Sequence, residues 1–216
     1  MSLIIDDFFD QEDFLKIQGL FLGPKMPWYY LPTISVPSWI SDKIVDQYAI
    51  ETDACQCLIL DRSRNYLTEE YVVLYPYLMK MMSKLGYTEE NLYRVRTTMK
   101  WPKPGIGSEK YNIPHIDATW PHKTILFYLN NSDGDTRLFH QVQPPMKRNL
   151  EDINENADAK ELDEYAKNFI NTGFTVKESI SPKENRLIMF DGMQYHTAGI
   201  PVNSERRVIL NINIRE

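Results

Sequence analysis

The residues with the clearest chemical potential are two histidines and one aspartate. His115 and Asp117 stand two positions apart, and His196 follows much later, after an apolar stretch that ends in Phe190-Asp191-Gly192. On a strand, residues two apart point to the same face, so the imidazole of His115 and the carboxylate of Asp117 are predicted to converge. His196 then supplies the third corner of a metal site.

Two imidazoles and one carboxylate on one side of a metal are the ligand set of non-haem iron(II) enzymes, in which the other side stays open. The two cysteines, Cys55 and Cys57, are expected to be reduced thiols in or near the core. Without a second pair they do not complete a thiolate metal site. The other two histidines, His122 and His140, are expected to be surface residues or ordinary hydrogen-bonded ones.

The elements that must position the metal ligands begin with two helices. Asp10 is predicted to cap a helix that ends near Gly23. Thr68 opens a second helix that runs towards Gly86, and Pro76 inside it predicts a kink or a break.

From Leu92 onward the pattern changes to short strands separated by turn residues. The predicted strands are Leu92–Trp101, Thr124–Asn130, Arg137–Val142, Phe174–Ile180, Arg186–Phe190 and Arg207–Ile214. A polar segment with one apolar helical face, residues 152–173, is predicted to be a helical insertion. We therefore expect a single domain over 1–216, mostly β, in which 1–91 is mainly helical support and 92–216 forms a sandwich or barrel.

Composition narrows the classes of partner. The formal net charge is −6 and the sequence pI is about 5.3, so no basic stripe for nucleic acid is expected. No apolar run approaches the ~18 residues that a membrane helix needs. The first ten residues carry acids where a signal peptide carries bases, so we expect a cytoplasmic protein without membrane partners.

Several motifs stand around the three candidate ligands in a fixed order. They are Pro114-His-Ile-Asp-Ala118, Thr124-Ile-Leu-Phe-Tyr-Leu-Asn130, Gly134-Asp-Thr136, Pro182-Lys-Glu-Asn-Arg-Leu-Ile-Met-Phe190, His196 and Arg206-Arg-Val-Ile-Leu-Asn211. This order resembles the prolyl-4-hydroxylase-like branch of the iron(II)- and 2-oxoglutarate-dependent oxygenases, including its microbial and phage members. The resemblance covers about Arg94 to Ile214, and the N-terminal third matches only loosely.

The resemblance implies a double-stranded β-helix, or jelly roll, with iron(II) held by His115, Asp117 and His196 as the catalytic centre. It also implies 2-oxoglutarate as co-substrate and dioxygen as oxidant. Arg207 is expected to bind the far carboxylate of 2-oxoglutarate, with Tyr128 donating to it. Arg206 is the rival, although alternation along the last strand favours Arg207. A bulge would reverse that choice. Asn211, which shares a face with Arg207, is a further candidate binding residue.

The activity implied is hydroxylation of a substrate carbon, in a prolyl or other residue of a protein or peptide. Hydroxylation of a small metabolite is the alternative within the same chemistry. From another class, the chain could be a non-catalytic, cupin-like metal-binding module, although the H-x-H with a nearby glutamate expected of a cupin is missing from the sequence.

Overall fold

Two antiparallel β-sheets form the body of the protein. The computed structural model describes residues 2–31, 54–105, 107, 111–142 and 172–215. Within these, the larger sheet contains β1 (Leu3–Ile5), β2 (Tyr29–Leu31), β3 (Ala54–Asp61), β4 (Tyr66–Leu67), β5 (Leu92–Lys100), β6 (Lys123–Tyr128), β9 (Leu187–Asp191) and β11 (Arg207–Ile214). Its order is β1-β9-β6-β11-β5-β3-β2, with β4 beside β3. The smaller sheet contains β7 (Thr136–Val142), β8 (Val176–Ile180) and β10 (Gln194–Ala198), in the order β10-β7-β8.

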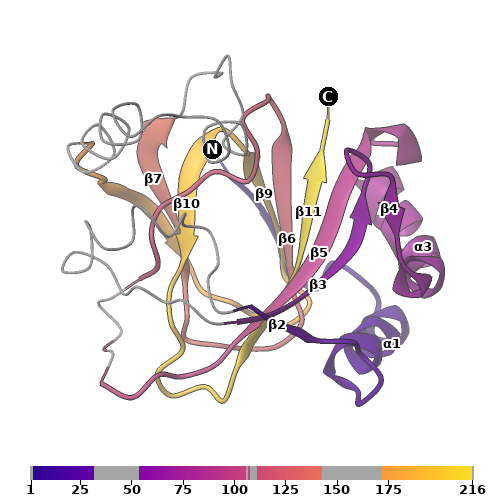
Figure 1. Cartoon of the computed structure of the whole chain (residues 1–216), viewed down its shortest axis with the longest axis horizontal. Helices are drawn as coiled ribbons and strands as arrows, with labels where there is room; N and C mark the ends of the chain where they lie inside the picture. Colours follow the sequence, from indigo (N-terminus) through magenta and orange to yellow (C-terminus); the bar gives the residue numbers. More distant parts are fainter. Residues whose placement is uncertain (1, 32–53, 106, 108–110, 143–171, 216) are drawn as a thin grey trace.

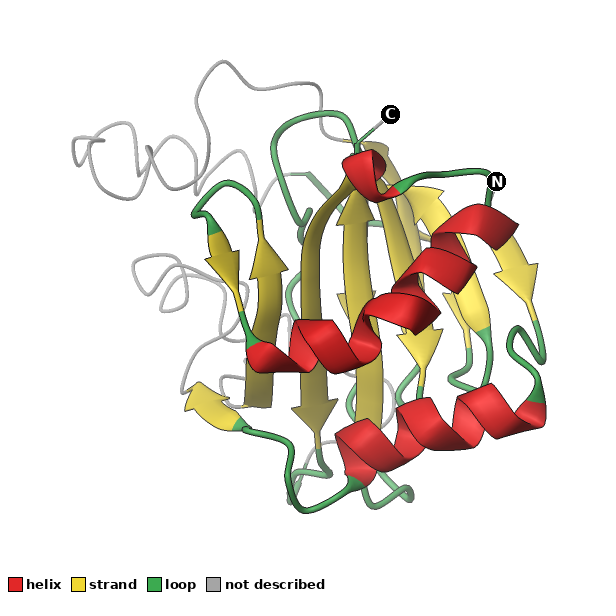
Figure 2. Cartoon of the chain, turned by 90° about the vertical axis from the view of Figure 1, so that its right-hand side faces the viewer, coloured by secondary structure: helices red, strands yellow, loops and turns green. Residues whose placement is uncertain are grey.

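Helices α1 (Gln11–Leu22) and α3 (Glu69–Lys84) cover the face of the larger sheet that points away from the smaller one (Figures 1 and 2). A short 3-10 helix, Glu89–Asn91, follows α3 and leads into β5. Helix α1 begins as predicted, because the Asp10 side chain accepts a hydrogen bond from the backbone N–H of Asp13 at 2.9 Å. It ends at Gly23, also as predicted.

Helix α3 follows Thr68 as expected, but it does not break at Pro76. Proline removes the hydrogen bond that the carbonyl of residue 72 would accept. Val72 lies on the outer side of the helix with 69% of its surface exposed, where water can take the place of that bond. Of the predicted kink or break at Pro76, the break is therefore wrong, and the kink stays a prediction.

The larger sheet is buried on both faces. Towards the helices, the buried apolar residues include Phe14, Ile17, Leu74, Leu78 and the β11 residues Val208, Leu210, Ile212 and Ile214. Towards the smaller sheet, the cluster contains Leu126, Tyr128, Leu138, Ile180, Ile188, Phe190 and Ile209. Every residue of β11 is buried, because β5 and β6 flank it and a core covers each of its faces.

All six strands predicted from Leu92 onward are confirmed, as is a mostly β jelly-roll fold with supporting helices. The described strands β1, β3, β4 and β10 were not predicted. The N-terminal third also supplies more than helices, because β1, β2, β3 and β4 join the larger sheet. The insertion predicted over 152–173 falls almost entirely outside the described residues.

The two cysteines are free thiols on β3, with Cys57 buried and Cys55 partly exposed. None of the helices in the described part of the chain is long and apolar enough to cross a membrane. The expected cytoplasmic location and the absence of nucleic-acid partners stay predictions.

Candidate metal centre

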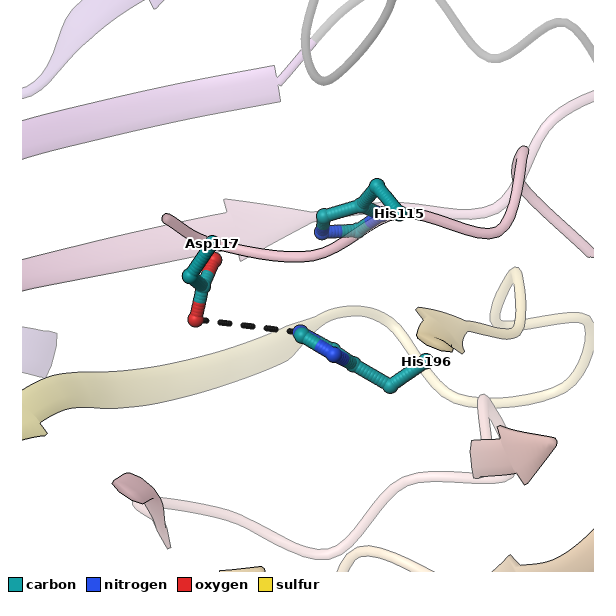
Figure 3. Close-up of side chains that lie close together, drawn as sticks. All are labelled: His115, Asp117 and His196. Atoms are coloured by element: carbon teal, nitrogen blue, oxygen red, sulfur yellow. Dashed lines mark ion pairs between the residues drawn. The ribbon is translucent and has the colours of Figure 1, made fainter. Parts of the chain in front are cut away.

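Three side chains that the sequence singled out meet in space. The ligand atoms of His115, Asp117 and His196 all lie within 4.8 Å of one another. The Nε2 atom of His196 is 3.7 Å from Oδ2 of Asp117, and the two imidazole rings have centroids 4.7 Å apart (Figure 3). Residues almost eighty positions apart in the chain thus point at one common centre.

The backbone explains this meeting. His196 belongs to β10, and it forms an isolated antiparallel bridge with His115, with a hydrogen bond of 2.9 Å in each direction. Asp117 follows two residues later in a bend. The prediction that H-x-D lies on a regular strand is therefore wrong in detail, because a single bridge, rather than a ladder, aligns the segment.

Both histidines have one ring nitrogen engaged and one available. Nδ1 of His115 lies 3.1 Å from the carbonyl oxygen of Ile113, and Nδ1 of His196 lies 3.2 Å from that of Gln194. A carbonyl only accepts, so each Nδ1 carries the proton and each Nε2 offers its lone pair. Burial lowers the pKa of His115 to about 3 and also lowers that of His196, which keeps both rings neutral near pH 7.

The Asp117 side chain has no exposed surface, and several polar groups contact its carboxylate. Arg96 forms an ion pair with Oδ1. Oδ2 accepts hydrogen bonds from Asn213 Nδ2 at 3.0 Å, Asn211 Nδ2 at 3.1 Å and Thr124 Oγ1 at 3.3 Å. Burial by itself would raise the pKa of Asp117, but Arg96, His196 and Arg94 together hold it well below its usual value. The site thus presents one carboxylate and two neutral imidazoles.

This donor set fits iron(II). Imidazole nitrogen and carboxylate oxygen both suit that ion, and three protein ligands on one side leave the other side for exogenous ligands. A cavity opens beside the histidines, lined by Gln56, Arg96, Thr98, Lys100, His115, Leu126, Thr136, His196, Thr197, Ala198, Arg207, Ile209 and Asn211. Its volume of about 60 Å³ is several times the ~10–15 Å³ that one water requires, so a small molecule has room to enter.

Arg207 reaches this cavity from β11. Its side chain is 2% exposed, and its Nη2 donates to the hydroxyl of Thr136 at 2.7 Å. The hydroxyl of Tyr128 lies 2.7 Å from the same Thr136 oxygen, and its ring lies 5.7 Å from the Arg207 guanidinium carbon. A buried arginine fork with two hydroxyls beside it is suited to a carboxylate.

The other two predicted binding residues, Arg206 and Asn211, make contacts that differ from those of Arg207. Arg206 is only partly buried and does not line the cavity. The alternation predicted for the last strand is confirmed, because the ladder irregularity of β11 falls after Asn213 and not near Arg207. Asn211 lines the cavity but directs its Nδ2 to the carboxylate of Asp117.

Comparison with solved structures identifies the fold. The chain matches a 2OG-Fe(II) oxygenase family protein from Burkholderia pseudomallei (TM-score 0.57, 12% identity, covering 99% of this chain and 84% of that one). It also matches the non-heme alpha-ketoglutarate-dependent epimerase SnoN from nogalamycin biosynthesis (TM-score 0.52, 10% identity, covering 100% of this chain and 77% of that one). A third match is a prolyl hydroxylase from Trichoplax adhaerens in complex with a hypoxia inducible factor peptide (TM-score 0.50, 15% identity, covering 99% of this chain and 83% of that one).

The chain has the fold of the 2OG-Fe(II) oxygenases. The resemblance drawn from the sequence motifs is thus confirmed at the level of the fold. No family model matches the sequence, and no curated protein matches it either.

Within this oxygenase fold, sequence reasoning missed Arg96, Lys100 and Thr136 as site residues. Arg96 and Lys100 alternate along a strand that was predicted, but only its pairing with β11 shows that both face the cavity. Thr136 stood in a quoted motif, Gly134-Asp-Thr136, without a role assigned to it.

The two remaining histidines, His122 and His140, differ in burial. His140 is exposed on β7, as expected. His122 is 3% exposed, so it is no surface residue; its Nδ1 lies 2.7 Å from the Trp120 carbonyl, while its Nε2 has no hydrogen-bond partner among the described residues. Its ring fills the space against Gly192, where an added Cβ would come within 2.2 Å of it. His122 therefore packs beside the metal centre without joining it.

Proposed function

We propose that the chain is an iron(II)- and 2-oxoglutarate-dependent oxygenase. The observation that carries the proposal is one cavity that is lined both by His115 and His196, two of the three converging ligands, and by the buried Arg207 of β11. A molecule that chelates the metal and ends in a carboxylate matches both features. 2-Oxoglutarate has this form.

In this assignment His115 and His196 bind iron through Nε2, and Asp117 binds it through a carboxylate oxygen. Arg207 binds the far carboxylate of 2-oxoglutarate, with the hydroxyl groups of Thr136 and Tyr128 beside it. Iron(II) bound here would supply the redox chemistry by which dioxygen, 2-oxoglutarate and a substrate C–H group are converted into succinate, carbon dioxide and the hydroxylated substrate.

The protein's own residues orient the reactants and keep water out. Arg96, Asn211 and Asn213 fix the Asp117 carboxylate, so its orientation is set before metal arrives. Burial raises the pKa of Tyr128, which therefore keeps its hydroxyl proton and remains able to donate it. The apolar side chains of Leu126 and Ile209 complete the cavity wall.

For the substrate, we propose a carbon of a prolyl or other residue in a protein or peptide. The motif order of the prolyl-4-hydroxylase-like branch supports this choice, as does a peptide-bound prolyl hydroxylase among the structures that share the fold. A small metabolite is the second candidate, favoured by the likeness to the epimerase SnoN from nogalamycin biosynthesis.

The direct test is iron-dependent conversion of 2-oxoglutarate into succinate without added substrate. The wild-type protein should form succinate slowly, and His196→Ala should abolish it. His140→Ala is the matched control, because His140 is an exposed histidine of β7 and should leave the rate unchanged. A folded, iron-loaded wild type that forms no more succinate than His196→Ala would contradict the proposal. To separate the two substrate classes, the enzyme is then incubated with proline-containing peptides or with a metabolite mixture. Mass spectrometry shows which of the two gains about 16 Da, the mass of one oxygen atom.

A further inference from the structure

One row of directly paired residues crosses the larger sheet from the cavity to the edge strand β2. Ile209 of β11 pairs with Thr98 of β5. Thr98 pairs in turn with Gln56 of β3, and Gln56 pairs with Tyr29 of β2. Directly opposite residues of an antiparallel ladder share a face, and the first three residues line the cavity. Tyr29 therefore continues the cavity face to the strand that ends the described sheet (Figure 1).

The row becomes more exposed towards this edge. Ile209 and Thr98 are each 7% exposed, and Gln56 is partly exposed. At the end of the row, 60% of the Tyr29 surface is exposed. The Gln56 side chain is directed along the row, since its Nε2 donates to Oγ1 of Thr98 at 3.2 Å. The row thus connects the cavity with an accessible aromatic ring.

The spacing of the strands sets how far Tyr29 lies from the cavity. Tyr29 and Thr98 are two strands apart, and neighbouring strands lie about 4.8 Å apart, so roughly 10 Å separates their backbones. An extended chain advances about 3.3 Å per residue and covers this distance in about three residues. A substrate confined to the cavity does not reach Tyr29, whereas an extended peptide does.

The position of Tyr29 matters more than its exposure, because single exposed apolar side chains are common. Its neighbour Tyr30 is almost equally exposed, at 61%. Tyr30 pairs with Cys55, which shares its face with Cys57 in the core beneath the helices. Of these two tyrosines, only Tyr29 lies on the cavity face, where its rigid ring offers a large contact area to a bound chain.

We propose that Tyr29 is a specificity-determining contact for a peptide substrate and that it binds an apolar side chain about three residues from the residue that is oxidised. The inference rests on the proposed function and deepens it. The oxidised residue lies in the cavity beside His115 and His196, and the substrate chain leaves along Thr98 and Gln56. The side-chain amide of Gln56 lies on this path, and an amide both donates to and accepts from peptide groups.

Two pools of capped peptides test this placement without a known substrate. One pool contains heptapeptides with a central proline and varied residues elsewhere, and the other contains tripeptides of the same design. The iron(II)-loaded protein is incubated with 2-oxoglutarate, dioxygen and each pool, and mass spectrometry identifies the peptides that gain one oxygen atom. The heptapeptides reach about three residues from the central proline, as far as Tyr29, whereas the tripeptides stay near the cavity.

The oxidised heptapeptides should be enriched in apolar residues at the outermost position on one side of the proline. Tyr29→Ala should remove this enrichment. It should also lower the rate on heptapeptides, relative to the rate on tripeptides, by about fivefold to thirtyfold, the usual effect of removing an important tyrosine contact. Tyr30→Ala is the matched control, because it removes a similarly exposed tyrosine from the other face, and it should keep the wild-type profile. Circular dichroism shows that both variants are folded.

The possible failures are distinguishable. Oxidised heptapeptides without a preference at the outermost positions, or a wild-type preference in Tyr29→Ala, overturn the role of Tyr29. Pools in which no peptide is oxidised overturn the peptide substrate, and the proposed function then stands if 2-oxoglutarate still gives succinate without added substrate. A folded, iron-loaded protein that forms no succinate overturns the proposed function itself.

Discussion

Asp133→Asn removes the charge from a carboxylate that ties the turn before β7 to the loop before β11. The carboxylate accepts hydrogen bonds from the backbone N–H groups of Val202, Asn203 and Ser204 at 3.1, 2.8 and 3.2 Å. Strand β11 begins three residues later with Arg207. The hydrogen bonds to Asp133 therefore help to fix the position from which the Arg207 guanidinium enters the cavity.

The pKa of Asp133 gives the size of the effect. Burial alone would raise it, but the hydrogen bonds from Asn203, Ser204 and Val202 lower it from 3.8 to about 2. At 1.36 kcal/mol per pH unit the shift corresponds to at most about 2.4 kcal/mol. Because the side chain is partly exposed and screened by solvent, we expect about 1–2 kcal/mol.

The sign follows from the lowered pKa. The carboxylate contributes its full stability above the unfolded value of 3.8, and that contribution is lost as the pH falls through about 2. Urea denaturation should show Asp133→Asn less stable than wild type by about 1–2 kcal/mol at pH 7, with the difference shrinking as the pH approaches 2. A stability difference between wild type and Asp133→Asn that stays constant from pH 7 to about pH 2 would show that the charge of Asp133 is not its cause.

Three further predictions concern the site and its support. Arg207→Ala should weaken binding of 2-oxoglutarate by at least about thirtyfold, and Arg206→Ala should barely change it, as measured by anaerobic titration; the reverse ranking would contradict the assignment. Gly134→Val should lower stability by about 1–3 kcal/mol and also weaken 2-oxoglutarate binding, because a Cβ there would lie 3.2 Å from Cδ of Arg207 and 2.9 Å from the Gly199 carbonyl oxygen. Gly19→Ala, in α1 with no atom within 4 Å of the added Cβ, should instead raise the melting temperature.

Much of the site could be predicted because its chemistry is concentrated in rare residue types. The chain has four histidines, and only His115 has an aspartate two positions away. Alternation along β11 was readable because one of its faces is entirely apolar, while all its polar residues lie on the other face together with Ile209.

What escaped prediction depends on long-range pairing. Strand β10 is short and mixed in polarity, so its sequence gave little strand signal, although it carries His196. The ion pair of Arg96 with Asp117 joins residues twenty-one positions apart, from a strand and a bend. Likewise Lys100 faces Arg207 only through the register of β5 with β11. Sequence periodicity predicts which face a side chain takes, but not which partner strand that face meets.

The central claim is that His115, Asp117 and His196 hold iron(II) with one side open to 2-oxoglutarate. Anaerobic titration of the protein with iron(II) and 2-oxoglutarate, followed by visible absorption, tests it most directly. We predict a weak charge-transfer band that requires both components, is lost in His196→Ala and persists in His140→Ala. A folded protein that gives no band, or a band unchanged in His196→Ala, would contradict the claim.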